Sequence, residues 1–200
     1  MCIRDSNEGA AGPIYPTPVV GMVGRLPDAR RAGRLGFARP GDAVAIAGAF
    51  HPSLGASELH KLCGEPLPDG LPEADVAAVR SALEAVRDAV RDGALTSCHD
   101  VAEGGFLVAV AECCLAGGVG ATLDLGPSDE PMVDLFGEGP GGFVVSGPRE
   151  ALEALAARVA LDVLGEVGGD ALSVTVAGRS LSLPLDELRA AHADLERLFP

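Results

Sequence analysis

The segment Ser97–Gly105 (SCHDVAEGG) carries the greatest density of chemically useful residues in this 200-residue sequence. The Asp100 carboxylate could bind Mg²⁺ through a hard oxygen, and His99 could orient or hydrogen-bond a phosphate. Gly104 and Gly105 would let a phosphate or another backbone approach the start of a helix closely. The alternative is structural: the histidine is a satisfied polar residue, a carboxylate supports the first helical turn, and the glycines permit tight packing.

A second group of candidates lies in the Gly-rich stretch Leu135–Gly142 (LFGEGPGG), which precedes an apolar run. A carboxylate held in such a turn, here Glu138, could accept hydrogen bonds from a hydroxylated substrate or from backbone N–H groups. The alternative is an ordinary turn with a solvated carboxylate. Leu54–Leu59 is expected only to start a helix. The histidines outside the first segment have no metal-ligand spacing: they are His51, His60 and His192.

The five cysteines are odd in number and show no CxxC pairing, which is typical of small buried residues in a reducing cytosol. Cys113 and Cys114 are adjacent within an apolar stretch. Cys98, which stands beside His99, could instead be a reactive thiol. We expect packing to explain it, because free cysteines are usually buried.

The formal net charge of −14 and the aromatic content of 4% argue against nucleic-acid binding, which needs clustered Lys and Arg and stacking rings. The overall field repels an anionic phosphate, so backbone N–H groups, a few placed cations or Mg²⁺ would have to hold one. No apolar run reaches the roughly 18 residues of a membrane span. We therefore expect a soluble, cytoplasmic protein that binds neither nucleic acid nor membrane.

Alternating strands and helices must position these candidates. Apolar spacings of three and four residues in Glu73–Arg91 predict an amphipathic helix, and Phe106–Ala116 is typical of a buried one. Leu95–Cys98 is a predicted strand, so His99–Gly105 falls in a strand-to-helix turn, where α/β proteins often bind ligands. Further strands are predicted at 43–48, 120–125, 142–146, 162–167 and 171–176, and helices at 57–62, 149–159 and 186–198. The pattern indicates an α/β (α+β) fold with a mixed β-sheet packed with helices.

The amino-terminal region differs from the rest. Met1–Ser6 lacks the apolar region of a signal peptide and is interpreted as a candidate for non-native sequence. Residues 7–32 are interpreted as the end of a preceding domain plus a linker, with a short strand at Val19–Val23 that has no obvious neighbour. Pro27–Gly41 is polar and rich in Arg and Gly, as linkers are. Residues 33–200 are the predicted main domain.

Several segments together resemble the phosphoribosylformylglycinamidine synthase family, and more broadly the superfamily that includes aminoimidazole ribonucleotide synthetase. The most specific is Asn7-Glu8 followed by Tyr15–Gly24 (YPTPVVGMVG), which is similar to the end of the family's second ATP-binding-type domain. The segments that resemble the final carboxy-terminal domain follow in the family's order: Pro40–Asp42, Leu54–Glu58, His99–Gly105 and Phe136–Glu138. The resemblance covers residues 7–200 and implies an aminoimidazole ribonucleotide synthetase C-terminal-domain-like fold.

The resemblance implies an ATP-dependent carbon–nitrogen ligase of purine biosynthesis. In the family, ATP, Mg²⁺ and glutamine-derived ammonia convert formylglycinamide ribonucleotide to the amidine. The implied partners are the N-terminal domains of the same enzyme, a glutaminase subunit and a small accessory subunit. The family's catalytic His, ATP-binding Lys and principal Mg²⁺ carboxylates have no counterpart here, so no catalytic residue is assigned. The chain is expected to be a carboxy-terminal fragment, inactive alone.

Carried over residue by residue, the resemblance makes Asp100 a metal ligand, because it matches a position that binds the Mg²⁺ of a nucleotide in some family members. Ala102 stands where those members often have a nucleotide-contacting serine. The implied nucleotide-binding residues are His99, Ala102, Gly104 and Gly105. Glu138 matches a substrate-binding Glu of an ESQ-like motif, although Gly and Pro replace the Ser and Gln.

Two other hypotheses remain open. The first is a non-catalytic binding or assembly module, in which Asp100 and Glu138 are structural. The second is another ATP-using enzyme of the superfamily, such as a selenide- or thiamine-phosphate-handling kinase. The PTPVVG segment fits those enzymes less well.

Overall fold

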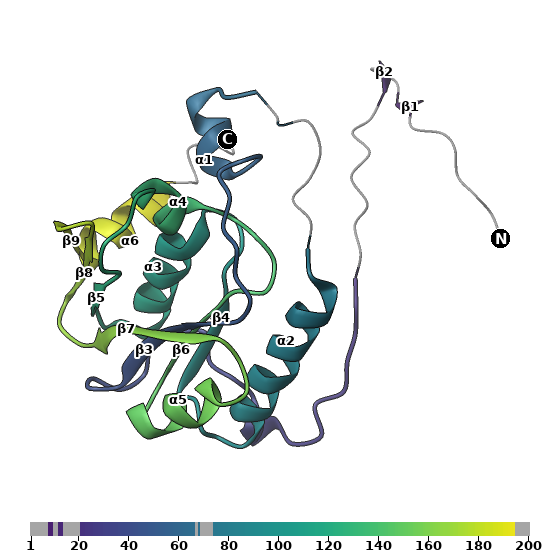
Figure 1. The fold of residues 1–200 in the computed structure, drawn as a ribbon, viewed down its shortest axis with the longest axis vertical. Helices are drawn as coiled ribbons and strands as arrows, with labels where there is room; N and C mark the ends of the chain where they lie inside the picture. Colours follow the sequence, from purple (N-terminus) through teal and green to yellow (C-terminus); the bar gives the residue numbers. More distant parts are fainter. Residues whose placement is uncertain (1–7, 10–11, 14–20, 67, 69–73, 195–200) are drawn as a thin grey trace.

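A computed structural model describes residues 8–9, 12–13, 21–66, 68 and 74–194 (Figure 1). The amino-terminal segment holds a small antiparallel pair, β1 (Glu8–Gly9) and β2 (Gly12–Pro13), and one 3-10 turn, η1 (Ala29–Arg31). The strands of the main sheet are β3 (Ala43–Ala47), β4 (Ser97–Asp100), β5 (Ala121–Asp124), β6 (Phe143–Gly147), β7 (Leu161–Val167), β8 (Ala171–Val176) and β9 (Arg179–Pro184). The helices are α1 (Glu58–Cys63), α2 (Val76–Arg91), α3 (Gly105–Gly117), α4 (Pro131–Phe136), α5 (Arg149–Ala156) and α6 (Leu185–Ala193).

The main sheet is mixed and has the strand order β4-β6-β3-β7-β5-β8-β9. Among the described strands of this sheet, β5 and β8 pair in parallel and the other neighbours run antiparallel. Strand β4 lies at one edge, paired with β6 from Ser97 opposite Ser146 to Asp100 opposite Phe143. The predicted α/β (α+β) class with a mixed sheet and packed helices is confirmed.

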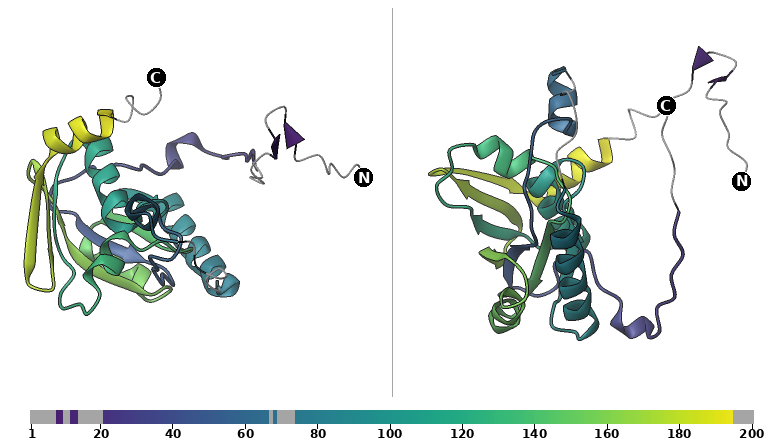
Figure 2. Two further views of the ribbon diagram at one scale, coloured as in Figure 1. Left: turned by 90° about the horizontal axis from the view of Figure 1, so that it is seen from above. Right: turned by 45° about the vertical axis from the view of Figure 1, so that its right-hand side comes forward.

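Helices cover both faces of this sheet, because the central strands alternate their side chains between two cores (Figures 1 and 2). In β3, Val44 packs with the core of α3, α4 and α6, whereas Ala43 and Ala45 pack with that of α2 and α5. Helix α3 supplies the largest share of the first core, including Phe106 and Val110, which are almost fully buried. The predicted buried helix is thus confirmed.

Most predicted elements occur within a few residues of their expected positions, but β4 begins and ends later than predicted. The expected strand Leu95–Cys98 is wrong at its carboxyl end, because pairing with β6 continues through His99 and Asp100. These two residues are thus in a strand instead of a loop. Helix α4 and strand β9 were not predicted, and residues 195–198 of the last expected helix lie outside the described residues.

The predicted strand at Val19–Val23 is wrong for its last three residues. Gly21–Val23 belong to no strand, Val23 is fully exposed, and Val19 and Val20 lie outside the described residues. A strand needs a neighbour to accept its backbone hydrogen bonds. The described residues 21–27 instead extend away from the sheet and its helices (Figures 1 and 2). Met1–Ser6 and Tyr15–Pro18, on which other interpretations rest, also lie outside the described part.

The linker Pro27–Gly41, which precedes β3, is anchored to the domain at several points. The Cys98 amide donates to the Arg34 carbonyl (2.8 Å), and the Phe37 amide donates to the Cys113 carbonyl at the end of α3 (3.0 Å). Phe37 is 1% exposed and belongs to the α3 core. The linker consequently covers the free edge of β4. None of the helices in the described part of the chain combines the length and apolarity that crossing a membrane requires.

Candidate functional site

The first candidate segment lies where β4 passes into α3. Strand β4 ends at Asp100, and α3 starts at Gly105 after a short turn. Gly104 (φ 85°) and Gly105 (φ 76°) have left-handed backbone conformations, which L residues with a side chain rarely adopt. The Gly104 position before α3 supplies no side-chain cap, and the first amides of a helix lack partners within the helix. The Gly104 amide donates to Glu138 Oε1 (2.8 Å) and the Gly105 amide to the Ala102 carbonyl (3.1 Å), so the donors for an anion would have to be the amides that follow in the first turn of α3.

His99 points to the α3 side of the sheet and is flanked by two carboxylates. Its Nε2 atom lies 2.8 Å from Glu112 Oε2, and its Nδ1 atom lies 3.2 Å from Asp100 Oδ1. Both partners are acceptors, so only the doubly protonated ring can make both bonds at once. The side chain is 14% exposed. Glu112 was missed as a partner, since it stands on the next element, 13 residues away.

Asp100 is the exposed member of this segment, with 69% of its side chain accessible. Within the described residues, no group of three or more His, Cys, Asp or Glu side chains is placed to hold a metal ion. Mg²⁺ in nucleotide sites, however, usually takes one or two carboxylates and completes its shell with phosphate oxygens and water. The Asp100 carboxylate fits the role of one such ligand. The exposed Ala102 contributes no polar side chain.

Glu138 is not the solvated turn residue of the structural alternative. Its Oε1 atom accepts hydrogen bonds from the backbone amides of Gly104 (2.8 Å) and Glu58 (2.8 Å). Its backbone also pairs with Ser53 in both directions, through an isolated bridge. The two candidate segments and the start of α1 are therefore joined through one carboxylate, although 80 residues separate Glu58 from Glu138.

The cysteines support the packing interpretation. Burial raises the pKa of the Cys98 thiol to about 11, with a smaller contribution from the charge of Asp100. Burial likewise raises the pKa of Cys114 to about 12 and that of Cys113 further. A thiolate is the nucleophilic form, so these three residues are poor nucleophiles near neutral pH. Cys63 is exposed.

Comparison with known proteins places the chain among relatives of one enzyme. Residues 39–177 match the family model described as "AIR synthase related protein, C-terminal domain". Phosphoribosylformylglycinamidine synthase subunit PurL of Moorella thermoacetica is 39% identical over 193 residues, which are 91% of this chain and 26% of that protein. The Sinorhizobium fredii (strain NBRC 101917 / NGR234) subunit is 34% identical over 206 residues, with 97% and 26% covered. The chain thus spans about a quarter of the length of these curated relatives.

Solved structures share the fold. Thermotoga maritima PurL complexed with FGAR superposes with a TM-score of 0.65 at 21% identity, covering 80% of this chain and 30% of that one. The hydrogenase maturation protein HypE in complex with ATP gives a TM-score of 0.54 at 18% identity, covering 88% and 57%. At these identities the likeness shows the fold, which confirms the expected C-terminal-domain-like architecture.

Proposed function

Because the chain belongs to the family of the AIR synthase related protein C-terminal domain, we propose that it is the carboxy-terminal part of a phosphoribosylformylglycinamidine synthase. The observation that most strongly supports this proposal is the 39% identity to a curated synthase subunit over 91% of the chain. The whole enzyme would be an ATP-dependent ligase that converts formylglycinamide ribonucleotide to the amidine with glutamine-derived ammonia. Its partners would be the preceding domains, a glutaminase subunit and a small accessory subunit. The fold similarity to PurLQS from Thermotoga maritima supports such an assembly.

Within that enzyme, we propose that the turn between β4 and α3 forms one wall of a nucleotide site. The left-handed backbone at Gly104 and Gly105 places no side chain at the start of α3, and the next amides of its first turn would supply donors for a phosphate. The exposed Asp100 carboxylate would contribute one oxygen to Mg²⁺, and His99 would lie beside it. Ala102 would contact the nucleotide only through its backbone.

A substrate contact by Glu138 remains a prediction. Because Oε1 already accepts the amides of Gly104 and Glu58, its clearest role is to hold the nucleotide-binding turn in place. The second oxygen, Oε2, would then be the atom that meets a hydroxyl of the substrate.

Calorimetric titration of the chain with ADP and Mg²⁺ tests the nucleotide site. We expect saturable binding that weakens about tenfold or more in Asp100→Asn, since a charge-assisted contact contributes about 1.5–3 kcal/mol. The matched control is Asp129→Asn, which removes the same charge from a position elsewhere on the chain. Absence of binding in the unchanged protein would favour the alternative of a scaffold module.

The expected inactivity of the isolated chain is tested separately. Formylglycinamide ribonucleotide, ATP, Mg²⁺ and ammonia are supplied, and formation of the amidine is followed. No turnover is expected, because the implied catalytic residues have no counterpart in the sequence. Turnover by this chain alone would overturn the proposal that the chemistry resides in the preceding domains.

A further inference from the structure

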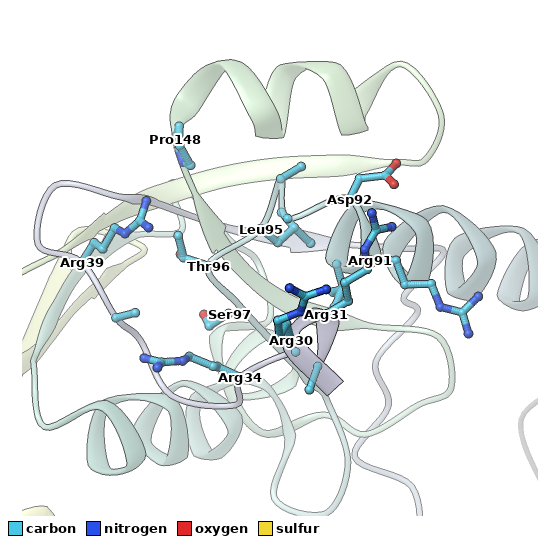
Figure 3. A pocket seen from close by; sticks show the side chains of 16 residues that line it. Arg30, Arg31, Arg34, Arg39, Arg91, Asp92, Leu95, Thr96, Ser97 and Pro148 are labelled. Carbon is cyan, nitrogen blue, oxygen red and sulfur yellow. The ribbon is translucent and has the colours of Figure 1, made fainter. Parts of the chain in front are cut away.

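A cavity of about 540 Å³ lies at the opposite end of β4 from the candidate nucleotide site (Figure 3). Its floor includes Thr96 and Ser97 at the start of β4, whereas the nucleotide-binding turn follows Asp100 at the end of that strand. Such a volume is within the usual range of small-ligand pockets, roughly 300–1,000 Å³. No role proposed above uses this cavity.

Arginines dominate its lining. Five of the chain's fifteen Lys and Arg residues line the cavity. Among the described residues, the lining includes one carboxylate, that of Asp92. As Figure 3 shows, they stand around the floor: Arg34 and Arg39 on one side, Arg30, Arg31 and Arg91 on the other. They come from the linker, η1 and the end of α2. In a chain of net charge −14, such a local concentration of positive charge is unusual.

Four of these arginines lack an acidic partner within the part of the chain that the structure describes. Arg30 forms an ion pair with Asp28 at 3.0 Å. Among the described residues, no carboxylate lies within ion-pair distance of the guanidinium of the other four, which are Arg31, Arg34, Arg39 and Arg91. Neighbouring like charges repel one another, and this repulsion destabilises the folded state. A bound anion with several charges would relieve it.

The backbone that carries Arg34 and Arg39 is held in place. The Arg34 carbonyl accepts the Cys98 amide at 2.8 Å, and the Gly41 amide donates to the Val167 carbonyl at 2.9 Å. Between them, Phe37 is buried in the α3 core. The two side chains therefore project from an ordered segment, which reduces the entropy that ligand binding must overcome.

The floor beneath the arginines is polar but already satisfied. Thr96 Oγ1 donates to the buried Asp42 carboxylate (2.6 Å), and the hydroxyls of Ser97 and Ser146 bond one another (2.6 Å). These groups have no need of a ligand. Recognition of an anionic ligand would therefore depend on the guanidinium groups, whose forked N–H donors match phosphate oxygens.

We propose that this arginine-lined cavity is a second anion site, which binds a small molecule carrying two or more phosphate charges. A single carboxylate would neutralise only one of the four guanidinium groups that have no described acidic partner, so a diphosphate matches the charge better. The site would be independent of Mg²⁺, because arginines and not carboxylates form it.

Titration with inorganic pyrophosphate, without Mg²⁺ and at low ionic strength, tests this proposal on the full 200-residue chain. We expect one saturable site, weakened about tenfold by the double variant Arg34→Gln/Arg39→Gln and several-fold by Arg91→Gln. Arg91 lies on α2, so its variant leaves the linker untouched. Asp100→Asn should bind pyrophosphate like the unchanged protein, which separates this site from the proposed nucleotide site.

Arg179→Gln is the matched control, since it removes an exposed arginine from β9 and should change the affinity less than about twofold. Circular dichroism confirms that each variant is folded. The proposal is overturned if pyrophosphate shows no saturable binding, or if Arg179→Gln weakens it as much as the pocket variants do. Equal or tighter binding of a hexaglutamate peptide would also overturn it, in favour of an acidic protein segment as the occupant.

Discussion

Glu138 shows how one side chain can join segments that lie far apart in the sequence. Its carboxylate was predicted to meet substrate or, alternatively, solvent. In the structure it accepts the amides of Gly104 and Glu58, which start α3 and α1. Partly buried amides without an acceptor are costly, so this carboxylate stabilises the position of both helix starts. The turn of the proposed nucleotide site therefore depends on a residue from a different loop.

Replacement of Glu138 with Ala should lower the free energy of unfolding by about 2 kcal/mol, because two amides lose their acceptor. Urea denaturation measures the change. Glu153→Ala, at an exposed position of α5, is the control and should change stability by less than about 0.5 kcal/mol. Equal stability of the two variants would show that solvent replaces the carboxylate without cost.

The cysteines differ in their expected reactivity. We expect iodoacetamide at about pH 8 to label Cys63 and to spare Cys98, Cys113 and Cys114 in the folded protein, as read by mass spectrometry of peptides. Folding raises the pKa of Cys98, so the neutral thiol favours the folded state below the ordinary pKa. That contribution disappears as the pH rises through about 11. Rapid labelling of Cys98 under the same conditions would revive the reactive-thiol hypothesis.

At the scale of elements, close contact between the end of α4 and the start of α3 determines which residue can begin α3. A Cβ atom at Gly105 would lie 2.6 Å from the Phe136 carbonyl carbon and 2.8 Å from the Gly137 oxygen, both of them backbone atoms. The end of α4 thus packs directly on the start of α3. Only glycine satisfies both this contact and the positive φ angle of 76°.

Gly105→Ala should therefore destabilise the protein more than Gly118→Ala, which makes a useful comparison. Gly118 ends the same helix with a φ of 68°, but a Cβ atom there would meet no described atom within 4 Å. Its substitution costs only the left-handed backbone penalty of about 1–2 kcal/mol. Thermal unfolding ranks the variants. Similar losses at both positions would show that the backbone of α4 can move away from α3.

The boundary of β4 illustrates why an element could be predicted but not its end. The segment Leu95–Cys98 was predicted as a short strand that stops before His99. The strand continues because β6 supplies partners for His99 and Asp100, and this pairing depends on a segment distant in the sequence, Phe143–Gly147. A polar sequence can be a strand where a neighbour accepts its hydrogen bonds.

For the whole molecule, the domain boundary at residue 33 stays a prediction that truncation can test. Removal of residues 1–32 should leave a cooperatively unfolding domain that is no less soluble, because exposed apolar residues such as Met22 and Val23 are removed. Circular dichroism during thermal unfolding gives the measurement. Removal of residues 1–38 should cost about 3–5 kcal/mol more, since it also removes the buried Phe37. A broad, non-cooperative transition of the shorter truncation would contradict the boundary.

The sequence by itself determined the type and order of most elements, the mixed α/β class and the family, because helical periodicity, apolar runs and short motifs are local properties of the chain. Only the tertiary structure decided which of these segments meet. It joined Glu138 to Gly104 and Glu58, and it gathered arginines from the linker, η1 and α2 around one cavity. The physical reason is that such contacts come from packing between segments far apart in the chain. A local sequence pattern does not specify which distant segment will pack against it.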